Sequence, residues 1–270
     1  MHYGIGIDIG GTGIKAGLVD LEAAQLAFKR NRVLTPKPAT PDAVVAVVVE
    51  ALDGMIEKAV RKEAIASVAD LDGMPLGVAF PGVVKNGVVE FAPNLDPSWI
   101  GANLVERVEA ATGRTCHVIN DADAAGLAEM SFGAGQDYRK KVAVMTTLGT
   151  GIGTAVFARG HLLPFTELGH IEMNGADAET QAAESVKVRE GLSYEEWAGR
   201  LQQYYTMLER LLNPDVFIVG GGVSKSHAEF LPLLDLKTPI VPAQLFNDAG
   251  MVGAGYLAAN DGKAKVKKQR

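Results

Sequence analysis

The stretch Tyr3-Gly4-Ile5-Gly6-Ile7-Asp8-Ile9-Gly10-Gly11-Thr12-Gly13-Ile14-Lys15 decides the fold class of this chain. Small and branched residues alternate over 3–9, which predicts a β-strand, and residues 14–19 predict a second strand. The glycine-rich turn between the two strands leaves no room for a helix. We therefore expect a β-hairpin at the start of the first sheet.

The same arrangement recurs in the second half of the chain. Residues 142–148 and 154–158 predict strands, and Gly149-Thr150-Gly151-Ile152-Gly153 predicts the turn between them. If Gly10 is aligned with Gly149, Ala16 falls on Ala155 and Leu18 falls on Phe157. A repeat at such a long separation indicates two similar halves rather than a solenoid, whose periods are much shorter.

The remaining segments alternate between helix and strand signals. Thr40 and Pro41 predict the start of a helix, because apolar residues then recur at helical spacing up to Ile56. Further strands are expected at 76–80, 117–119 and 216–219, and further helices at 122–132 and 194–212. The pattern predicts an α/β protein with an N-terminal lobe, 1–120, and a C-terminal lobe, 121–270, whose final helix could pack back on the first lobe. Ligands are expected in the cleft between the lobes.

Composition excludes several classes of protein. The chain has 270 residues of which 47% are apolar, a balance that excludes disorder, and its longest apolar stretch, 43–49, is too short to cross a bilayer. The first residues lack the basic and apolar regions of a secretion signal, and the single cysteine, Cys116, suits a reducing compartment, so we expect a cytoplasmic protein. The net charge of −6 argues against a nucleic-acid partner, and the basic tail, 263–270, is interpreted as a solvated end.

Three glycine-rich turns are candidate phosphate sites: Asp8 to Lys15, Thr147 to Gly153, and Gly220 to Ser224. Glycine lets backbone N–H groups approach an anion closely and adopt positive φ, and threonine hydroxyls can add donors. The alternative is that tight hairpins simply need glycine. No G-x-x-x-x-G-K-[ST] motif occurs, and the turn at 149–153 leads into a strand, whereas a dinucleotide-binding turn opens a helix.

The order of these turns resembles a known superfamily. Asp8 to Lys15 is similar to the first phosphate motif of the actin, Hsp70 and hexokinase superfamily, Leu148 to Gly153 to the second, and Val219 to Ser224 to its adenosine motif. Within it the chain resembles the ROK sugar kinases, and among them the polyphosphate-dependent glucokinase branch. The resemblance covers essentially the whole chain. It implies a two-lobed actin-like ATPase fold with duplicated ribonuclease-H-like domains, closure on a sugar, and a homodimer.

Asn120-Asp121 ends one predicted strand and begins a helix. From spacing alone, a carboxylate at this position favours a helix N-cap over a catalytic base. The resemblance reverses that preference, because it implies that Asp121 accepts the proton of the sugar hydroxyl. Asp123 is interpreted as a charge in the first turn of the helix.

The same resemblance implies a sugar site. Glu167-Leu168-Gly169-His170 is similar to the family's E-x-G-H motif, and Glu184 falls where many members carry another sugar-binding glutamate. Gly82, Asn94 and Asn120 complete the expected sugar contacts. Typical members follow E-x-G-H with a zinc-binding C-x-C-G-x-x-G-C run, but residues 171–183 contain no cysteine, so we expect no zinc site.

The expected reaction is phosphorylation of the 6-hydroxyl of glucose, with mannose as a further acceptor, by inorganic polyphosphate, ATP or both. Asp8 is expected to position Mg²⁺ through water. Lys15 is expected either to offset the negative charge of the phosphates or to be a solvated lysine on the strand. The expected phosphate and nucleotide contacts are Asp8, Gly10, Gly11, Thr12, Gly13, Lys15, Thr147, Gly149, Thr150, Gly151, Gly221 and Gly222. A polyphosphate chain would need a cationic track, for which Lys85, Arg139 to Lys141, Lys187 and Arg189 are candidates.

Three other functions compete with this one. An ATP-only ROK kinase for an N-acetylhexosamine would need space for the acetamide. A sugar-sensing ROK repressor carries an extra N-terminal DNA-binding module, and the first turn begins here at Asp8. A non-catalytic nucleotide-binding protein of the actin type would not need the sugar motifs around Asp121 and Glu167.

Overall fold

The computed structural model describes residues 3–92 and 95–266. The chain forms two compact units. Unit 1 contains Met1–Ala128 and Asp248–Ala264, and unit 2 contains Glu129–Asn247 and Lys265–Arg270. The domain boundary expected after residue 120 stays a prediction.

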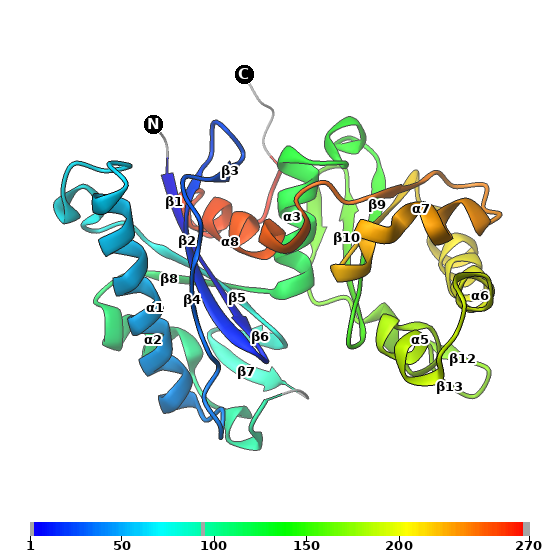
Figure 1. The fold of residues 1–270 in the computed structure, drawn as a ribbon, viewed down its shortest axis with the longest axis horizontal. Coiled ribbons are helices and arrows are strands. Elements are labelled where there is room, and N and C mark those ends of the chain that lie inside the picture. Colours follow the sequence, from blue (N-terminus) through cyan, green and yellow to red (C-terminus); the bar gives the residue numbers. More distant parts are fainter. Residues whose placement is uncertain (1–2, 93–94, 267–270) are drawn as a thin grey trace. The chain divides into compact units, whose positions relative to one another are not determined.

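Unit 1 is built on a sheet in the order β3-β2-β1-β5-β8, with β4 pairing β2 (Figure 1). β1 and β2 are antiparallel, whereas β1, β5 and β8 run parallel. A small separate sheet pairs β6 with β7. The strands are β1 (Tyr3–Gly10), β2 (Gly13–Asp20), β3 (Gln25–Leu26), β4 (Asn31–Val33), β5 (Leu76–Phe80), β6 (Val83–Lys85), β7 (Val88–Phe91) and β8 (Cys116–Asn120). The helices are α1 (Pro41–Arg61), α2 (Leu104–Thr112), α8 (Ala249–Ala259) and α3 (Asp121–Phe132), whose residues after Ala128 belong to unit 2.

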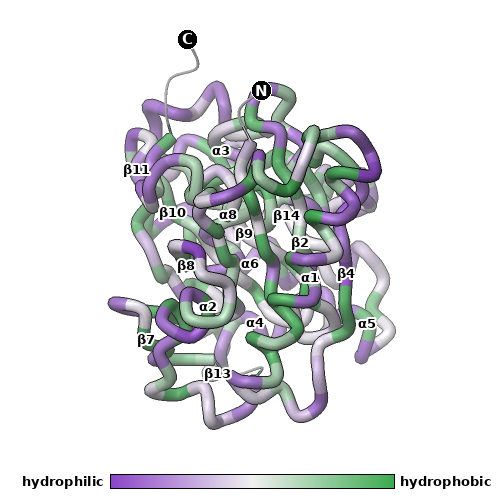
Figure 2. The backbone as a smooth tube through the Cα atoms, turned by 90° about the vertical axis from the view of Figure 1, so that its left-hand side faces the viewer, coloured by the Kyte–Doolittle hydropathy of each residue, from purple (hydrophilic) through white to green (hydrophobic). Residues whose placement is uncertain are grey.

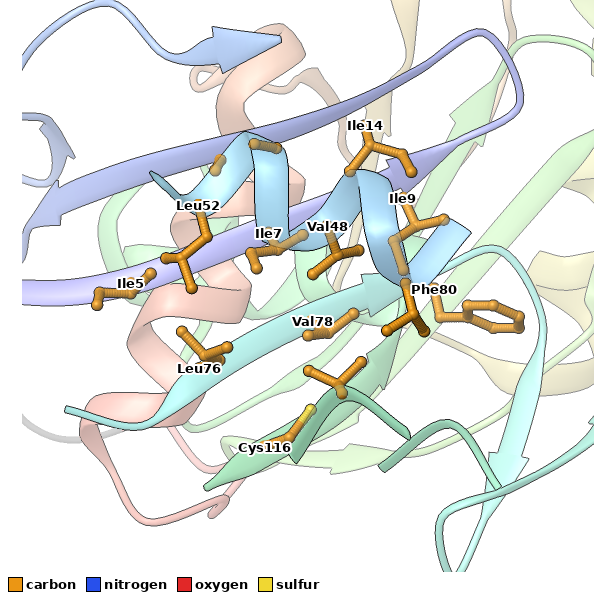
Figure 3. Close-up of a cluster of buried hydrophobic side chains, with 14 of the residues drawn as sticks. Ile5, Ile7, Ile9, Ile14, Val48, Leu52, Leu76, Val78, Phe80 and Cys116 are labelled. Atoms are coloured by element: carbon orange, nitrogen blue, oxygen red, sulfur yellow. The ribbon is translucent and has the colours of Figure 1, made fainter. Parts of the chain in front are cut away.

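The two faces of β1 are packed differently because side chains alternate across a strand. Ile5, Ile7 and Ile9 are fully buried and belong to the core that includes Val48 and Leu52 of α1 (Figure 3). This aliphatic layer removes a continuous apolar surface from water, which is the main stabilising contribution to the unit.

The opposite face of β1 carries glycines and packs directly on α8. A Cβ on Gly4 would overlap the carbonyl oxygen of Gly255, and one on Gly6 would overlap that of Met251. α8 is buried from Ala249 to Ala258 apart from Gly250, so its small residues let the helix backbone rest on the strand backbone. Asp8 is the next residue on this face, and Gly250 in the first turn of α8 lies beside its carboxylate.

Unit 2 repeats the sheet of unit 1 in the order β11-β10-β9-β14-β15. β9 and β10 are antiparallel, and β9, β14 and β15 run parallel. Its strands are β9 (Val142–Leu148), β10 (Ile152–Ala158), β11 (His161–Leu163), β12 (Glu172–Met173), β13 (Ala176–Asp177), β14 (Val216–Gly220) and β15 (Ile240–Pro242), and its helices are α4 (Glu179–Ala182), α5 (Glu184–Glu190), α6 (Tyr194–Leu212) and α7 (His227–Phe230). The predicted α/β class with a duplicated, hairpin-led sheet is confirmed.

The register of the repeat differs from the one that the sequence predicts. Core-facing Ile9 and Ile14 pair in the first hairpin, with four residues between them. Core-facing Leu148 and Ile152 pair in the second hairpin, with three residues between them. Core-facing Ala16 therefore corresponds to Thr154 rather than Ala155, and Leu18 corresponds to Val156 rather than Phe157, because the second turn is one residue shorter and shifts everything that follows it.

Most of the long predicted elements are confirmed. α1 begins at Pro41 with Thr40 as its N-cap residue, although the Thr40 side chain makes no capping hydrogen bond, and α6 spans the predicted residues 194–212. Hydrophilic residues lie mainly in the connecting loops, whereas strands such as β9 carry hydrophobic residues (Figure 2). Within the described residues, no helix is both long and apolar enough to span a membrane.

Candidate active site

The first glycine turn, residues 10–13, lies at the tip of the β1–β2 hairpin. Gly11 and Thr12 are exposed there, so their backbone groups are open to a ligand. Asp8 and Lys15 are directly paired across the two strands, and their side chains form an ion pair with 2.7 Å between Nζ and Oδ2. Lys15 is therefore not a freely solvated strand lysine, since it balances the charge of the aspartate beside the turn.

The expectation of positive φ in the glycine turns is wrong for the two hairpins. Among the glycines expected to bind phosphate or nucleotide, only Gly221 has a positive φ, at 89°. A Cβ on Gly13 would lie 2.5 Å from Nε of Arg32, and one on Gly151 would overlap the carboxylate of Glu179. At these two positions glycine leaves space for a neighbouring side chain rather than supplying a special backbone conformation.

The junction of β8 and α3 shows which residue caps the N-terminus of α3. Asn120 is buried, and its Oδ1 accepts hydrogen bonds from the backbone N–H groups of Ala122, at 2.9 Å, and Asp123, at 3.1 Å. Asn120 is thus the residue that caps the first turn of α3. The next residue, Asp121, is exposed and accepts from the N–H of Ala122 at 2.8 Å. Asp123 lies in the first turn of α3 as expected, and its side chain is buried.

Asn120 also connects α3 to the loop after β5. Its Nδ2 donates to the carbonyl oxygen of Gly82 at 3.3 Å. A Cβ on Gly82 would overlap the carbonyl oxygen of Phe91, so this loop requires glycine. Unit 1 therefore brings Gly82, Asn120 and Asp121 together, whereas Asn94 lies outside the described residues.

The second glycine turn, residues 149–151, is held by α4 and α5. The N–H of Gly149 donates to the carbonyl of Gly151 at 3.1 Å, so this amide is not available to a phosphate as expected. Ser185 binds the turn twice, through its N–H to Gly149 and through its hydroxyl to Thr150. The amides of Thr150 and Gly151 have no protein partner among the described residues, so these two remain for an anion.

The segment 167–170 packs against the end of the same turn. A Cβ on Gly169 would overlap the carbonyl oxygen of Ile152, so the glycine of the motif allows this approach. Glu179, the first residue of α4, accepts a hydrogen bond from the N–H of Ile152 at 3.0 Å. Its other carboxylate oxygen lies 3.9 Å from Nδ1 of His170. The second glycine turn and the predicted sugar motif thus form one connected structure within unit 2.

Carboxylates determine the electrostatics of this motif. His170 Nδ1 lies 2.9 Å from Oδ2 of Asp177, and this hydrogen bond raises the pKa of His170, with smaller contributions from the charges of Glu179 and Glu167. Burial raises the pKa of Glu167, and the nearby His170 charge opposes that change. In this arrangement the carboxylates can accept hydrogen bonds from the hydroxyls of a polyhydroxyl ligand, and an imidazole N–H can donate one.

The glycine-rich turn after β14 completes the group of motifs in unit 2. A Cβ on Gly221 would overlap the backbone of Leu148, and Gly220 pairs with Thr147, so this turn lies against the second hairpin. Glu184 lies beside it, with Oε2 3.9 Å from the position of a Cβ on Gly222. Burial raises the pKa of Glu184, and Lys187 opposes this effect.

The family model for "ROK family" matches residues 4–191, which is well over half of the chain and includes both hairpins and the motif at 167–170. The chain belongs to the ROK family.

Similar proteins share nearly the full length of this ROK protein. It is 44% identical to a polyphosphate glucokinase of Mycobacterium tuberculosis (strain CDC 1551 / Oshkosh) over 96% of this chain and 92% of the relative. The crystal structure of an inorganic polyphosphate/ATP-glucomannokinase from Arthrobacter sp. strain KM is 48% identical, with a TM-score of 0.86 over 97% of this chain and all of that one. A ROK glucokinase from Streptomyces griseus, in complex with glucose and AMPPNP, is 28% identical with a TM-score of 0.77, over 96% and 99% of the two chains.

Sequence reasoning missed four side chains that this ROK protein places at the two turns: Glu179, Ser185, Arg32 and Thr35. Arg32 and Thr35 contact the first glycine turn, and Glu179 and Ser185 contact the second. Each is about 20 or more residues from the turn that it contacts, so no local motif reveals it. Glu179, Glu184 and Ser185 lie close together in the sequence, but the sequence pattern predicts a functional role only for Glu184.

The cations considered for a polyphosphate track are mostly engaged. Lys85 pairs with Glu90, and Arg189 pairs with Glu190. Arg139 donates to the carbonyls of Met130 and Ser131. Lys141 and Lys187 lie over tyrosine rings, the latter 4.2 Å from the centroid of Tyr194. Among residues 3–92 and 95–266, no group of three or more His, Cys, Asp or Glu side chains could hold a metal ion.

Proposed function

We propose that this ROK protein is a glucokinase of the hexokinase type, which transfers a phosphoryl group from inorganic polyphosphate, ATP or both to the 6-hydroxyl of glucose, with mannose as a second acceptor. Full-length similarity to a polyphosphate glucokinase and to a polyphosphate/ATP-glucomannokinase supports the reaction and its donors. The observation that carries the catalytic assignment is that Asn120, and not Asp121, caps α3, while the Asp121 side chain is exposed at the start of the helix.

The proposed step is an in-line displacement at the terminal phosphorus of the donor. The oxygen of the glucose 6-hydroxyl forms a bond to phosphorus, the bond to the bridging oxygen breaks, and the shortened donor leaves with that oxygen. Asp121 accepts the hydroxyl proton as the new bond forms. Its Oδ1 accepts a hydrogen bond from the Ala122 N–H, which helps to orient the carboxylate at the start of α3.

Backbone amides are the proposed donors to the phosphoryl groups. The exposed Gly11–Thr12 part of the first glycine turn, between Gly10 and Gly13, and the amides of Thr150 and Gly151 have the required access. Lys15 adds positive charge beside the first turn, Thr147 adds a hydroxyl at the second, and Gly221 and Gly222 are proposed for the adenosine of ATP.

Seven residues are the proposed sugar contacts. Gly82, Asn94, Asn120 and Asp121 belong to unit 1, and Glu167, His170 and Glu184 belong to unit 2. The hydrogen bond from Asn120 to Gly82 supports a common role for the two residues. The position of Glu179 supports adding it to this set, because one of its carboxylate oxygens lies 3.9 Å from Nδ1 of His170.

Mg²⁺ is the metal ion that phosphoryl transfer from these donors would use. A single carboxylate, Asp8, lies beside the first glycine turn, and its Oδ2 is paired with Lys15. One partly engaged carboxylate suits an ion that keeps most of its water and is held by donor phosphates. When bound, the ion would neutralise charge on the transferred phosphoryl group. The homodimer expected from the family stays a proposal.

The substitution Asp121→Asn tests the proposed base. The variant should bind glucose with nearly unchanged affinity, because an amide keeps the size and most hydrogen bonds, while kcat falls by about 10²–10⁴-fold. Asp53→Asn, an exposed change in α1, is the matched control and should keep full activity. Near-normal turnover of the Asp121 variant would remove that residue from the role of base.

The donor and the acceptor are identified in the same assay. Wild-type protein is tested with ATP and with polyphosphate, each with and without Mg²⁺, on glucose, mannose and N-acetylated hexosamines. Phosphorylation confined to an N-acetylhexosamine with ATP would replace the proposed function with the alternative kinase, which similarity to named glucokinases does not favour.

A further inference from the structure

Residues in β4 and just after it form hydrogen bonds with the first glycine turn. Nη2 of Arg32 donates to the carbonyl oxygen of Thr12 at 3.0 Å, and its guanidinium lies where a Cβ on Gly13 would be. Two residues beyond β4, the hydroxyl of Thr35 donates to the carbonyl oxygen of Gly10. The guanidinium of Arg32 therefore lies at the rim of the turn.

Arg32 extends a row of charged side chains across three strands. Asp8 of β1 is paired with Lys15 of β2, and Lys15 is paired with Arg32 of β4. Directly paired residues point to the same side of a sheet, and Ile14 and Ala16, which flank Lys15, point into the core with α1. The three charged side chains thus share the opposite face, next to the turn.

The charges in this row are not balanced. Lys15 neutralises Asp8, and Arg30, two residues before Arg32, pairs with Asp248. Arg32 is exposed and forms no ion pair within the part of the chain that the structure describes. A guanidinium has five N–H donors in a planar fork that matches phosphate oxygens, and the bond to Thr12 uses one of them.

We propose that Arg32 binds the phosphoryl groups of inorganic polyphosphate that follow those held by the first glycine turn. This inference rests on the proposed function and adds the residue that favours the long donor. Polyphosphate continues beyond the turn as a row of identical anions, whereas ATP ends in a nucleoside that carries no charge. A cation at the rim therefore contributes more to binding of polyphosphate than to binding of ATP.

The test compares KM values for long-chain polyphosphate, tripolyphosphate and ATP at saturating glucose. Arg32→Gln should raise KM for long-chain polyphosphate about fivefold, as expected for one exposed charge contact, with a smaller change for ATP and little change in kcat. Arg32→Lys should recover much of the loss, because it keeps the charge. Arg61→Gln, an exposed arginine in the last turn of α1, is the control for net charge.

Binding without turnover provides a second readout. Calorimetric titration of polyphosphate into the Asp121→Asn protein, with and without Arg32→Gln, should show the same weakening. Equal increases in KM for all three donors, or loss of kcat without a donor preference, would assign Arg32 a purely structural role in the turn and overturn the inference. Wild-type protein that phosphorylates glucose with ATP but neither binds nor uses polyphosphate would instead refute the donor part of the proposed function.

Discussion

At the scale of single residues, His170 gives a pH dependence with a definite sign. The hydrogen bond to Asp177, together with the charges of Glu179 and Glu167, raises the pKa of His170 above its usual 6.5. A group with a raised native pKa stabilises the fold fully at pH values below the unfolded pKa, and this contribution is lost as pH rises through the native pKa. The protonated imidazole therefore stabilises the segment 167–179 under mildly acidic conditions.

His170→Gln should consequently lower the urea midpoint at about pH 6 more than at about pH 9. The effect is small, because the side chain is partly exposed and solvent screens its charge. His161→Gln, in the exposed strand β11, is the control. An NMR titration that gives His170 a pKa at or below 6.5 would contradict the geometry of the carboxylates around it.

The Asn120-Asp121 pair illustrates what sequence can and cannot decide at a single position. Both residues are good N-caps, so the cap is assigned correctly only if the end of the preceding strand is known to one residue. β8 ends at Asn120, and the Asn120 side chain then reaches the first N–H groups of α3. The spacing argument placed this role on Asp121, and the structure moves it by one residue.

At the scale of elements, two helix glycines have opposite expected effects. A Cβ on Gly253 of α8 would overlap the backbone carbonyl of Ala124 in α3, and backbone atoms cannot rotate away. Gly199 of α6 has open space around the same position. Gly253→Ala should therefore destabilise the protein by about 3 kcal/mol or more through overpacking. Gly199→Ala should stabilise it by about 0.5–1 kcal/mol through helix propensity.

Chemical denaturation of the two variants measures both effects in one background. Because the same substitution is made in the interior of two helices, differences in side-chain chemistry cancel. Equal effects of the two substitutions would show that α8 does not pack backbone to backbone on its neighbours.

Long elements were predictable because their patterns are local. The hairpins, α1 and α6 follow from alternation, helical spacing and glycine placement within a single window of sequence. The short elements α4, β12 and β13 have no more than four residues each, which is too few for a period to emerge. Glu179 and Ser185 act on a turn about 30 residues earlier, and only the tertiary structure brings them there.

At the scale of the whole molecule, the duplication was predictable in order but not in register. Both units place a hairpin first and add parallel strands on the other side of its first strand. Strand order follows from local patterns, whereas the match of residues depends on turn length, and the core-facing pairs that close the two hairpins enclose four residues in unit 1 and three in unit 2. The shorter turn puts Thr154 where unit 1 has Ala16, and the Thr154 hydroxyl donates to the carbonyl of Thr166 just before the segment 167–170.

The net charge of −6 sets the final prediction, because a protein of this charge repels a polyanion on average. Binding of polyphosphate must then depend on local cations such as Lys15 and Arg32, and added salt screens these contacts, since the Debye length falls from about 10 Å at 0.1 M to about 3 Å at 1 M. A donor with many charges releases more counterions than ATP does, so kcat/KM for long-chain polyphosphate should fall more steeply with potassium chloride than kcat/KM for ATP. Sucrose at matched osmolality is the control for general solvent effects. Parallel salt dependences for the two donors would mean that both engage the same few charges, and the polyphosphate chain would then have no contacts beyond the glycine turns.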